Sequence, residues 1–492
     1  MAWGPARYWL TVIGGVNKQD MTVLRQDREL TELASGDNLI PDPVGKLVTA
    51  PSSTEVRATA MSGSPAVTGL FHQLRDRANV FILGGQDALH QDSANPPAAI
   101  SGGTAFTDSA DNLLRADVHE ALLIIVSRQR DLPQTINTSV TRADLGGTPP
   151  RGLDYKVFGR RGFMISPSIG GTIHYEKASY NSANDDHDAW TAPGTVNFLN
   201  FGREGSGVST LGGEVHANHL MVYTQDKVFP VYTTPNALAP FAIRDEVFSE
   251  DGGGPVGAHA IVSGGGKVFW VSRNFDVKRQ RGFSVESIGY AVQPFLRGLN
   301  QARMDFVSGG FDPRYRIVWW AVSESAQSTH NILMGVQADT EQFYFRTLAR
   351  NAFGYRVVSG EPRLIGGDYG GKFYNEFDGN TTVAIDADGQ TPPLHLGMPN
   401  EVKKVPYVAF RFAIIGSASV TISHRIDDAA SWTEFTGSPV TISGNRIETV
   451  QLPMPQPFEH LELRFRNNTS GERFRLLGIG FPQPVALRTV VD

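Results

Sequence analysis

Two stretches of the chain share one pattern of apolar and polar residues. The first begins at His219 and the second begins forty residues later, at His259. Without a gap they match at His219/His259, Val222/Val262, Lys227/Lys267, Val228/Val268, Phe229/Phe269 and Val231/Val271. Each stretch is an apolar run, a polar or glycine turn, and a second β-branched and aromatic run. This pattern predicts a β-hairpin in each stretch.

A hairpin that recurs at this spacing is typical of the blades of a β-propeller. The alternative is that the two stretches are ordinary hairpins of a single β-sandwich. We favour the propeller, because further runs with the same pattern precede and follow the matched pair. They lie at residues 67–73, 80–85, 120–126, 155–158, 162–166, 316–322, 331–336, 342–347 and 366–377.

The rest of the pattern divides the chain. Residues 1–55 are irregular and rich in proline, which predicts an extended strap, and residues 56–400 hold the propeller-like hairpins. Residues 84–112 predict a loop, 75–77 a charged turn, and 290–305 a modest helix. After a break at Thr391-Pro392-Pro393, residues 401–492 form a further part of the chain, in which residues 405–482 alternate apolar and polar positions with period two. This alternation predicts a separate C-terminal β-sandwich.

Composition agrees with an all-β fold. The 492 residues include 52 glycines, 29 prolines and 28 phenylalanines, and only 19% of residues are charged. This is the profile of a turn-rich β protein of more than one domain. The net charge of −6, with scattered lysines and arginines, predicts no basic patch for gripping nucleic acid. Cysteine is absent, which excludes disulfides, thiolate metal sites and cysteine nucleophiles.

The sequence also predicts a soluble protein made in a cytoplasm. The apolar run near the start, residues 8–13, is too short for a secretory signal and has no small-residue cleavage pattern. The longest aliphatic run, residues 121–126, is far shorter than a membrane span.

Two motifs have a structural and a chemical interpretation. Gly264-Gly265-Gly266-Lys267 resembles part of a phosphate-binding loop, but Ile261 stands where that pattern needs glycine and Val268 where it needs serine or threonine. We interpret it as a hairpin turn. His216 and His219 would be metal ligands if they lay on a helix. The segment reads as a strand, on which residues three apart point to opposite faces, so we predict no metal there.

Two acidic segments also have both interpretations. Asp185-Asp186-His187-Asp188 is a possible cation loop without the glycine and terminal glutamate of a calcium site, so we interpret it as a solvated loop. The segment from Asp427 to Trp432 resembles the Asp-box of sialidase-type propellers, in which the residues shape a turn. Here alanine replaces the glycine of the box, so we predict that Trp432 serves packing.

These motifs do not indicate an enzyme. The chain has no Gly-x-Ser-x-Gly elbow and no dinucleotide fingerprint, and no motif nominates the two carboxylates of a glycosidase. We therefore predict no catalytic residue, no cofactor and no metal.

The order of strap, propeller and sandwich resembles the tail hub or nozzle proteins of short-tailed bacteriophages, including the packaged-DNA stabilisation proteins. Three stretches carry the resemblance. They are residues 36–41 with 45–47, residues 190–272 around His219 and Trp270, and residues 420–479 around Trp432. Together they cover about three-fifths of the chain. The first twenty residues and 84–112 have no counterpart, so the number of N-terminal blades stays open.

The resemblance implies a structural virion protein. It implies a homo-oligomeric ring, a hexamer, below the portal and its adaptor ring. Such a ring encloses the DNA exit channel without sequence-specific binding, helps to retain the packaged genome, and supports fibres or a needle. Residues 181–188 and 251–257 are candidates for mobile loops at a gate. Two alternatives stay open: a non-catalytic adhesin that binds receptors through the sandwich, and a sialidase-like carbohydrate-active propeller.

Overall fold

The structure of the chain is a computed structural model. It describes residues 8–12, 29–30, 33–41, 47–73, 80–190, 197–202, 208–244, 247–248, 253–379, 385–396, 398, 401–415, 417–444, 447–467, 469, 473–482 and 484–489. The predicted turn at 75–77 and residues 42–46 of the predicted strap lie outside these ranges.

Seven sheets share one plan in the described part of the chain. Six of them have four strands and one has five, and in each the strands follow one another from an inner to an outer position. The inner strands are β7 (Val67–Gln73), β11 (Arg115–His119), β15 (Asp154–Phe158), β21 (Thr210–His216), β26 (Val262–Gly264), β30 (Ser308–Asp312) and β34 (Ala352–Val358). The second strands are β8 (Val80–Gly85), β12 (Leu122–Val126), β16 (Arg161–Ile165), β22 (His219–Thr224), β27 (Lys267–Ser272), β31 (Ile317–Val322) and β35 (Glu361–Gly367).

The remaining strands complete each sheet. The third strands are β9 (Ala88–Gln91), β13 (Gln134–Ile136), β19 (Lys177–Tyr180), β23 (Lys227–Thr233), β28 (Asp276–Arg281), β32 (Ile332–Gln337) and β36 (Phe373–Gly379). The outer strands are β10 (Ala98–Ala99), β14 (Arg142–Asp144), β20 (Phe198–Asn200), β24 (Phe241–Ile243), β29 (Ser284–Ser287), β33 (Phe343–Thr347) and β6 (Ser52–Glu55), and β25 (Val247–Phe248) also pairs with β23. A small hairpin, β17 (Ser168–Ile169) with β18 (Thr172–Ile173), stands apart.

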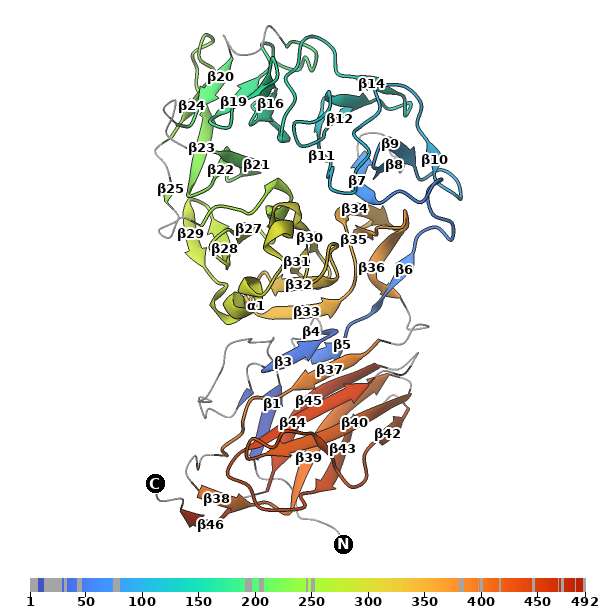
Figure 1. The fold of residues 1–492 in the computed structure, drawn as a ribbon, viewed down its shortest axis with the longest axis vertical. Helices are drawn as coiled ribbons and strands as arrows, with labels where there is room; N and C mark the ends of the chain where they lie inside the picture. The colour runs from blue at the N-terminus through green and yellow to red at the C-terminus, as the bar shows by residue number, and fades with distance from the viewer. Residues whose placement is uncertain are drawn as a thin grey trace. The chain divides into compact units, whose positions relative to one another are not determined.

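The seven sheets form a closed ring. With one exception, each inner strand contacts the inner strand of the next sheet. The exception is β21, which contacts the helical turn directly before β26, and the ring closes where β34 contacts β7. Figure 1 shows the sheets following one another around this ring. The last sheet takes its outer strand, β6, from the opposite end of the ring's sequence, which is a common way to lock a propeller. These residues form a seven-bladed β-propeller.

The second strand of each blade is packed on both faces by neighbouring blades. For this reason it reads as a continuous apolar run and does not alternate. All six residues of β31, including Trp319 and Trp320, are buried. The matched stretches of the sequence are both hairpins, but they occupy different positions in their blades. The first contains the second and third strands of its blade, and the second contains the first and second strands of the next blade. The first pairs β22 with β23, and the second pairs β26 with β27. The forty-residue spacing is therefore not the spacing of equivalent strands.

Glycines in the inner strands allow the blades to approach closely. A Cβ added to Gly354 of β34 would lie 2.3 Å from the carbonyl oxygen of Leu70 on β7, where the ring closes. A Cβ on Gly310 of β30 would lie 2.8 Å from Cβ of Phe353 on β34. At these positions a side chain would push adjacent blades apart.

Gly354→Ala is expected to lower the free energy of unfolding by about 1–3 kcal/mol, because the backbone of β7 cannot yield to the added methyl group without moving the blade. Urea unfolding followed by tryptophan fluorescence measures the change. Gly370→Ala is the matched control, since its Cβ would meet only the Asp368 carboxylate, at 3.7 Å. Equal midpoints for both variants would contradict the close approach.

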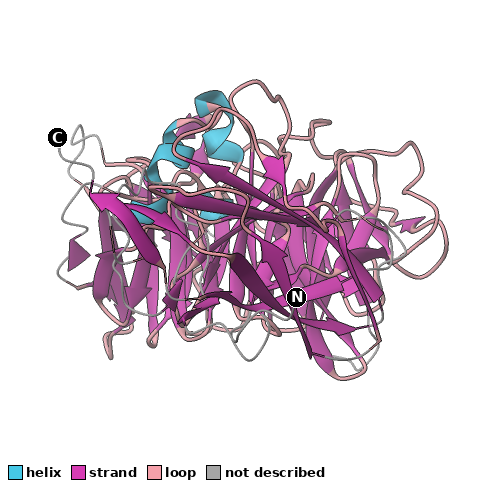
Figure 2. Cartoon of the chain, turned by 90° about the horizontal axis from the view of Figure 1, so that it is seen from below, coloured by secondary structure: helices cyan, strands magenta, loops and turns pink. Residues whose placement is uncertain are grey.

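Helical turns are few in the ranges that the structure describes. They comprise η1 (Ala258–Ala260), η2 (Tyr290–Val292), α1 (Gln293–Arg297) and η3 (Gln301–Phe306). The last three coincide with the helix predicted over 290–305. Figure 2 shows that strands dominate the chain. The predicted loop at 84–112 is wrong in part, because it contains β9 and β10. Only two residues of β9, Leu89 and His90, are buried, which leaves no apolar run to detect.

The C-terminal strands form two further sheets. One has the order β2-β1-β45-β39-β43, with β4 and β5 attached to it through β45, and the other has the order β3-β37-β44-β40-β41, with β42 on β40. The strands from the N-terminal end are β1 (Tyr8–Val12), β2 (Glu29–Leu30), β3 (Ser35–Asp37), β4 (Leu39–Pro41) and β5 (Leu47–Thr49). The others are β37 (Ala387–Gln390), β39 (Tyr407–Ile415), β40 (Ser417–Ile426), β41 (Thr433–Glu434), β42 (Val440–Ser443), β43 (Ile447–Pro453), β44 (Leu461–Asn467) and β45 (Arg473–Phe481), and a separate pair joins β38 (Glu401–Lys404) to β46 (Val485–Thr489).

The two sheets pack face to face through aromatic side chains. The rings of Phe465 on β44 and Phe474 on β45 lie 6.1 Å apart in an edge-to-face arrangement, and Phe412 contacts Phe474 from β39. This is a β-sandwich. The predicted fold class, an all-β chain with a propeller followed by a C-terminal sandwich, is confirmed.

The contacts between residues divide the chain into two compact units. One comprises Met1–Thr54, Met334–Thr347 and Phe377–Asp492, and the other comprises Glu55–Leu333 and Leu348–Glu376. The second unit holds the inner strand of every blade. The first unit joins both ends of the chain, because β1 and β5 pair with β45, and β3 pairs with β37. The N-terminal segment therefore contributes strands, where the sequence predicted an irregular strap.

Candidate functional site

A cavity lies at the centre of the propeller. Its volume is about 250 Å³, and it is lined by residues of all seven inner strands or of the turn before one of them. Its polar lining includes Arg115 of β11, Lys156 of β15, Glu214 of β21, His259 of η1 and Tyr355 of β34. Because every blade contributes to its wall, this cavity is the natural place to look for chemistry.

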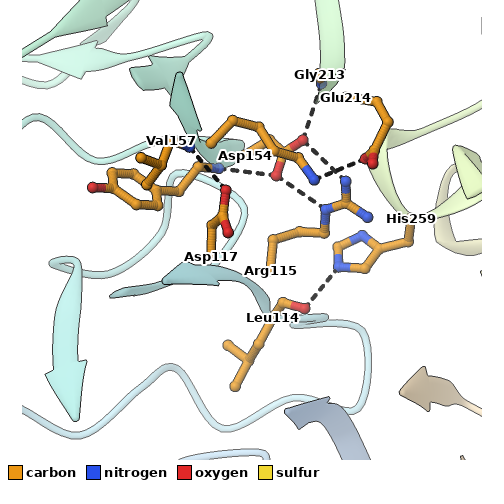
Figure 3. A network of polar contacts seen from close by, with 10 residues as sticks. Leu114, Arg115, Asp117, Asp154, Val157, Gly213, Glu214 and His259 are labelled. Atoms are coloured by element: carbon orange, nitrogen blue, oxygen red, sulfur yellow. Dashed lines mark hydrogen bonds and ion pairs between the residues drawn. The ribbon is translucent and has the colours of Figure 1, made fainter. Parts of the chain in front are cut away.

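The charged residues of the cavity pair across the blades (Figure 3). The guanidinium of Arg115 makes two parallel bonds to the Asp154 carboxylate, from Nε to Oδ1 at 3.0 Å and from Nη2 to Oδ2 at 3.1 Å. The backbone N–H of Gly213 donates to the same carboxylate at 3.0 Å. Arg115, Asp154 and Gly213 lie on β11, β15 and β21, so one buried carboxylate connects three consecutive blades.

Two further contacts join the same three blades. Lys156 Nζ lies 2.9 Å from Glu214 Oε2, which joins β15 to β21. The Asp117 carboxylate of β11 accepts from the backbone N–H of Val157 at 2.8 Å, which joins β11 to β15. Each ionised group of the network thus has an oppositely charged or hydrogen-bonding partner on the neighbouring blade.

The pKa values follow from burial and from these partners. Burial alone would raise the pKa of Asp154, but the charges of Arg115 and Lys156 and the bound N–H groups hold it below its ordinary value. Burial would lower the pKa of Lys156, but the charge of Glu214 raises it. In Asp117 burial prevails over Lys156, and the pKa is raised. Arg115, Asp154 and Lys156 are therefore ionised at neutral pH.

His259 is neutral in this environment. Burial, together with the positive charge of Arg115, lowers its pKa to about 3. Its Nε2 lies 3.0 Å from the carbonyl oxygen of Leu114, which can only accept, so Nε2 carries the proton. This bond joins the turn before β26 to the residue before β11, across the ring. The neutral imidazole therefore acts as a fixed hydrogen-bond donor.

Other polar contacts join the remaining blades to their neighbours. Trp320 Nε1 donates to the carbonyl of Ala260 at 2.8 Å, and the backbone N–H of Phe311 donates to the Tyr355 hydroxyl at 2.8 Å. At the closure of the ring, Asn351 Nδ2 donates to the carbonyl of Val67 at 2.9 Å. The central site therefore holds blades together. Across the described ranges, no group of three or more His, Cys, Asp and Glu side chains is placed to hold a metal ion.

The sequence motifs did not indicate this network. The motif Gly264-Gly265-Gly266-Lys267 lies in the β26–β27 turn, and the hairpin turn predicted for it is confirmed. Gly264 pairs with Lys267, and Gly265 and Gly266 have φ of +60° and +76°, the conformation of a tight hairpin turn. A signal for the network exists. Charged residues alternate with apolar ones inside short strands, as in Arg115-Ala116-Asp117.

The histidine pair is arranged differently from the prediction. His216 ends β21 and His219 begins β22, and the two residues face each other across a two-residue turn. Ala217 and Asn218 form that turn with positive φ, so the segment is not one continuous strand. His216 Nε2 accepts from the backbone N–H of Gly282 at 3.0 Å, which ties blade four to blade five.

The acidic loop is held by specific contacts. Asp185 pairs with Arg160, and His187 Nδ1 lies 3.0 Å from Glu120 Oε2. Asp186 and Asp188 are exposed. The loop is thus solvated at its carboxylates but tied to the β11–β12 and β15–β16 turns through Glu120 and Arg160.

The second candidate gate segment is packed closely in its described part. Residues 251 and 252 lie outside the described ranges, but Gly253 accepts from Trp270 Nε1 at 2.8 Å. A Cβ on Gly254 would lie 1.9 Å from the carbonyl oxygen of Thr224, so this glycine sits directly against the backbone of β22.

The degenerate Asp-box forms a turn in the sandwich. Asp427 and Asp428 have φ of +47° and +57°, and the Asp427 carboxylate accepts from the backbone N–H groups of Glu459 and His460. Trp432, for which we predicted a packing role, is not among the buried core residues. It is partly exposed and lies beside the guanidinium of Arg425, 4.9 Å from the ring centroid.

Comparison with known proteins gives fold relatives only. Neither a protein-family model nor a curated protein matches the chain. Among solved structures, it is similar to the extracellular domain of a hybrid two-component system from B. thetaiotaomicron, with 11% identity and a TM-score of 0.44. The match covers 93% of this chain and 66% of that domain.

Two smaller proteins are also similar. The β-propeller domain of Cps50 (Swd1) from Myceliophteria thermophila has 8% identity and a TM-score of 0.41, covering 65% of this chain and 98% of that domain. Virginiamycin B lyase from Staphylococcus aureus has 8% identity and a TM-score of 0.41, covering 64% and 96%. At these values the similarities carry no functional argument.

Proposed function

We propose that this chain is a non-enzymatic structural protein of a bacteriophage tail virion. In this role it is the subunit of a ring-shaped hub or nozzle below the portal and adaptor rings. The observation that carries the proposal is the central network. Its ion pairs, Arg115–Asp154 and Lys156–Glu214, are satisfied between blades, and this arrangement supports a rigid scaffold better than a catalytic centre.

The order of the parts also supports this role. Residues 36–41 of the strap lie in β3 and β4, His219 and Trp270 lie in the second strands of two blades, and residues 420–479 lie in the sandwich. These are the stretches that resemble tail hub proteins. In the described part of the chain no helix is long and apolar enough to cross a membrane.

A DNA channel in this role has to be built from several copies. The cavity of one propeller holds about 250 Å³. A DNA duplex is wider than its own major groove, which is about 12 Å wide. A cylinder of only that width already fills about 1,100 Å³ over a length of 10 Å. The duplex therefore passes between copies and not through the propeller. A net charge of −6 suits a conduit, because phosphate contacts would add salt-dependent barriers to sliding.

The native mass of the full-length protein tests the proposal. We expect a discrete closed oligomer of about six copies, with a ring visible by negative-stain electron microscopy. A closed ring keeps one mass over a range of concentrations above its assembly threshold, whereas non-specific association gives a broad distribution. A monomer at every concentration up to the solubility limit would overturn the proposal, as would open chains of variable length.

A further inference from the structure

The outer face of one sandwich sheet carries a tryptophan among charged residues. Along β40, Ile422 and His424 point into the sandwich and are buried, and along β44 Leu463 and Phe465 do the same. Because successive side chains of a strand point to opposite faces, the arginines between and beside these residues lie on the outer face. They are Arg425, Arg464 and Arg466.

Trp432 lies on this outer face. It directly precedes β41, in which Thr433 pairs with His424 of β40, so Trp432 comes next to Arg425 across the strands. The guanidinium carbons of Arg425 and Arg464 lie 4.9 Å and 6.0 Å from the ring centroid. The ring is therefore fixed against the sheet by two cation–π contacts, and its partial exposure leaves ring surface in solvent.

Every arginine of this face is paired with a carboxylate. Arg425 bonds to Glu462, and Arg464 Nε lies 3.0 Å and 3.1 Å from the two oxygens of Asp388. Beyond them, Arg466 Nε lies 2.7 Å from Asp386. We call this set the Trp432 face: Trp432, Arg425, Glu462, Arg464, Asp388, Arg466 and Asp386. Each of its three arginines bonds to a carboxylate, and this bonding orients them. Glu434 of β41 pairs with Ser423, which also faces outward, and therefore adds a fourth carboxylate to the same side of the sheet.

We propose that the Trp432 face binds a neutral pyranose glycan. One face of a pyranose ring presents C–H groups, which match the surface of an aromatic ring, and its edges carry hydroxyls that both donate and accept. The paired guanidinium and carboxylate groups offer fixed donors and acceptors at the rim of the ring. Because carboxylates outnumber arginines once Glu434 is counted, this side of the sheet does not attract an acidic sugar.

The same composition argues against other partners. A nucleic acid needs excess positive charge, which this side of the sheet does not have, because Glu434 adds a carboxylate to the three ion pairs. A protein interface usually has an apolar centre surrounded by a polar rim, whereas here one indole stands in a wholly polar field. The inference goes beyond the proposed hub role, since ring assembly and glycan binding are separate properties of the chain.

The test uses the full-length protein with maltohexaose, cellohexaose and mannohexaose as neutral probes, measured by isothermal titration calorimetry. We expect at least one probe to bind, and Trp432→Ala to weaken that binding at least tenfold, which corresponds to about 1.4 kcal/mol. Trp432→Phe should keep most of the affinity, because it keeps an aromatic ring. Tyr175→Ala removes an aromatic residue of the propeller that is 48% exposed and should leave binding unchanged.

Three results would overturn the proposal. They are no binding of any neutral probe, equal binding by Trp432→Ala and the unchanged protein, and binding of the polyuronate alginate in place of the neutral probes. The urea midpoint of each variant shows that it is folded. The native mass of each variant is recorded as well, so a failure of glycan binding is distinct from a failure of ring assembly.

Discussion

Replacing Arg115 by methionine is expected to lower the free energy of unfolding by about 3–5 kcal/mol, because it leaves the buried Asp154 carboxylate without its cation. The Asp154 side chain has no solvent exposure, and Arg115 is its bidentate partner. The measurement is urea unfolding at neutral pH. Arg160→Met is the matched control. It breaks an ion pair with Asp185 at the exposed surface and should leave the midpoint unchanged.

A double variant tests the cause. Arg115→Met with Asp154→Asn removes both charges but keeps an oxygen that can accept from the Gly213 N–H. It should recover most of the stability lost by the single change. A double variant as unstable as Arg115→Met alone would show that the loss comes from packing of the arginine stem and not from the uncompensated charge.

The effect should also depend on pH in a defined direction. In the unchanged protein the pKa of Asp154 is lowered, so its contribution is present above the unfolded pKa, about 3.9, and is lost as the pH falls through the lower folded value. Without Arg115, burial raises that pKa, and protonation relieves the buried charge as the pH falls. The stability difference between the two proteins should therefore be smaller at pH 5 than at pH 8.

Asn351→Leu is expected to lower the free energy of unfolding by about 2–4 kcal/mol, because it removes the donor to the buried carbonyl of Val67 and to the half-buried carbonyl of Ala110 where the ring closes. Asn351 is 1% exposed, and its Nδ2 donates to Val67 at 2.9 Å and to Ala110 at 3.0 Å. Leucine has a similar volume, so packing changes little. Hydrogen exchange should show faster exchange in β7 and β34.

Asn112→Leu is the control for this prediction. Asn112 is equally buried, but its Nδ2 bonds are local, to Thr107 and Asp131. It should lower stability without selectively increasing exchange in β34. If Asn351→Leu raised exchange evenly along the chain, the closure of the ring would not depend on this side chain.

The sequence predicts the second strands of the blades well and the outer strands poorly. Strands such as β31 are buried on both faces and therefore read as apolar runs. Outer strands such as β10 have exposed residues and no such run. The forty-residue match found real hairpins but set β22 against β26, because a hairpin of strands one and two resembles a hairpin of strands two and three. Only pairing reveals which strand is innermost.

The central network was hidden for a related reason. Arg115, Asp154 and Glu214 are far apart in sequence, and each lies in a short strand where a charged residue next to apolar ones locally reads as a solvent-facing position. The ring turns these positions toward one another. The placement of Trp432 was missed because its neighbours on β40 and β44 come together only through strand pairing.

Strands near the start of the sequence pair with strands that lie far along the chain. β1 pairs with β45 through Tyr8 and Phe481, and β6 is the outer strand of the sheet that contains β36. During synthesis the ribosome releases these early strands long before their partners exist, and contacts so distant in sequence form slowly. The middle blades can collapse while both edges of the structure stay open. A chain that stopped before β45 would leave β1 without this partner, and an unpaired strand edge of this kind favours aggregation.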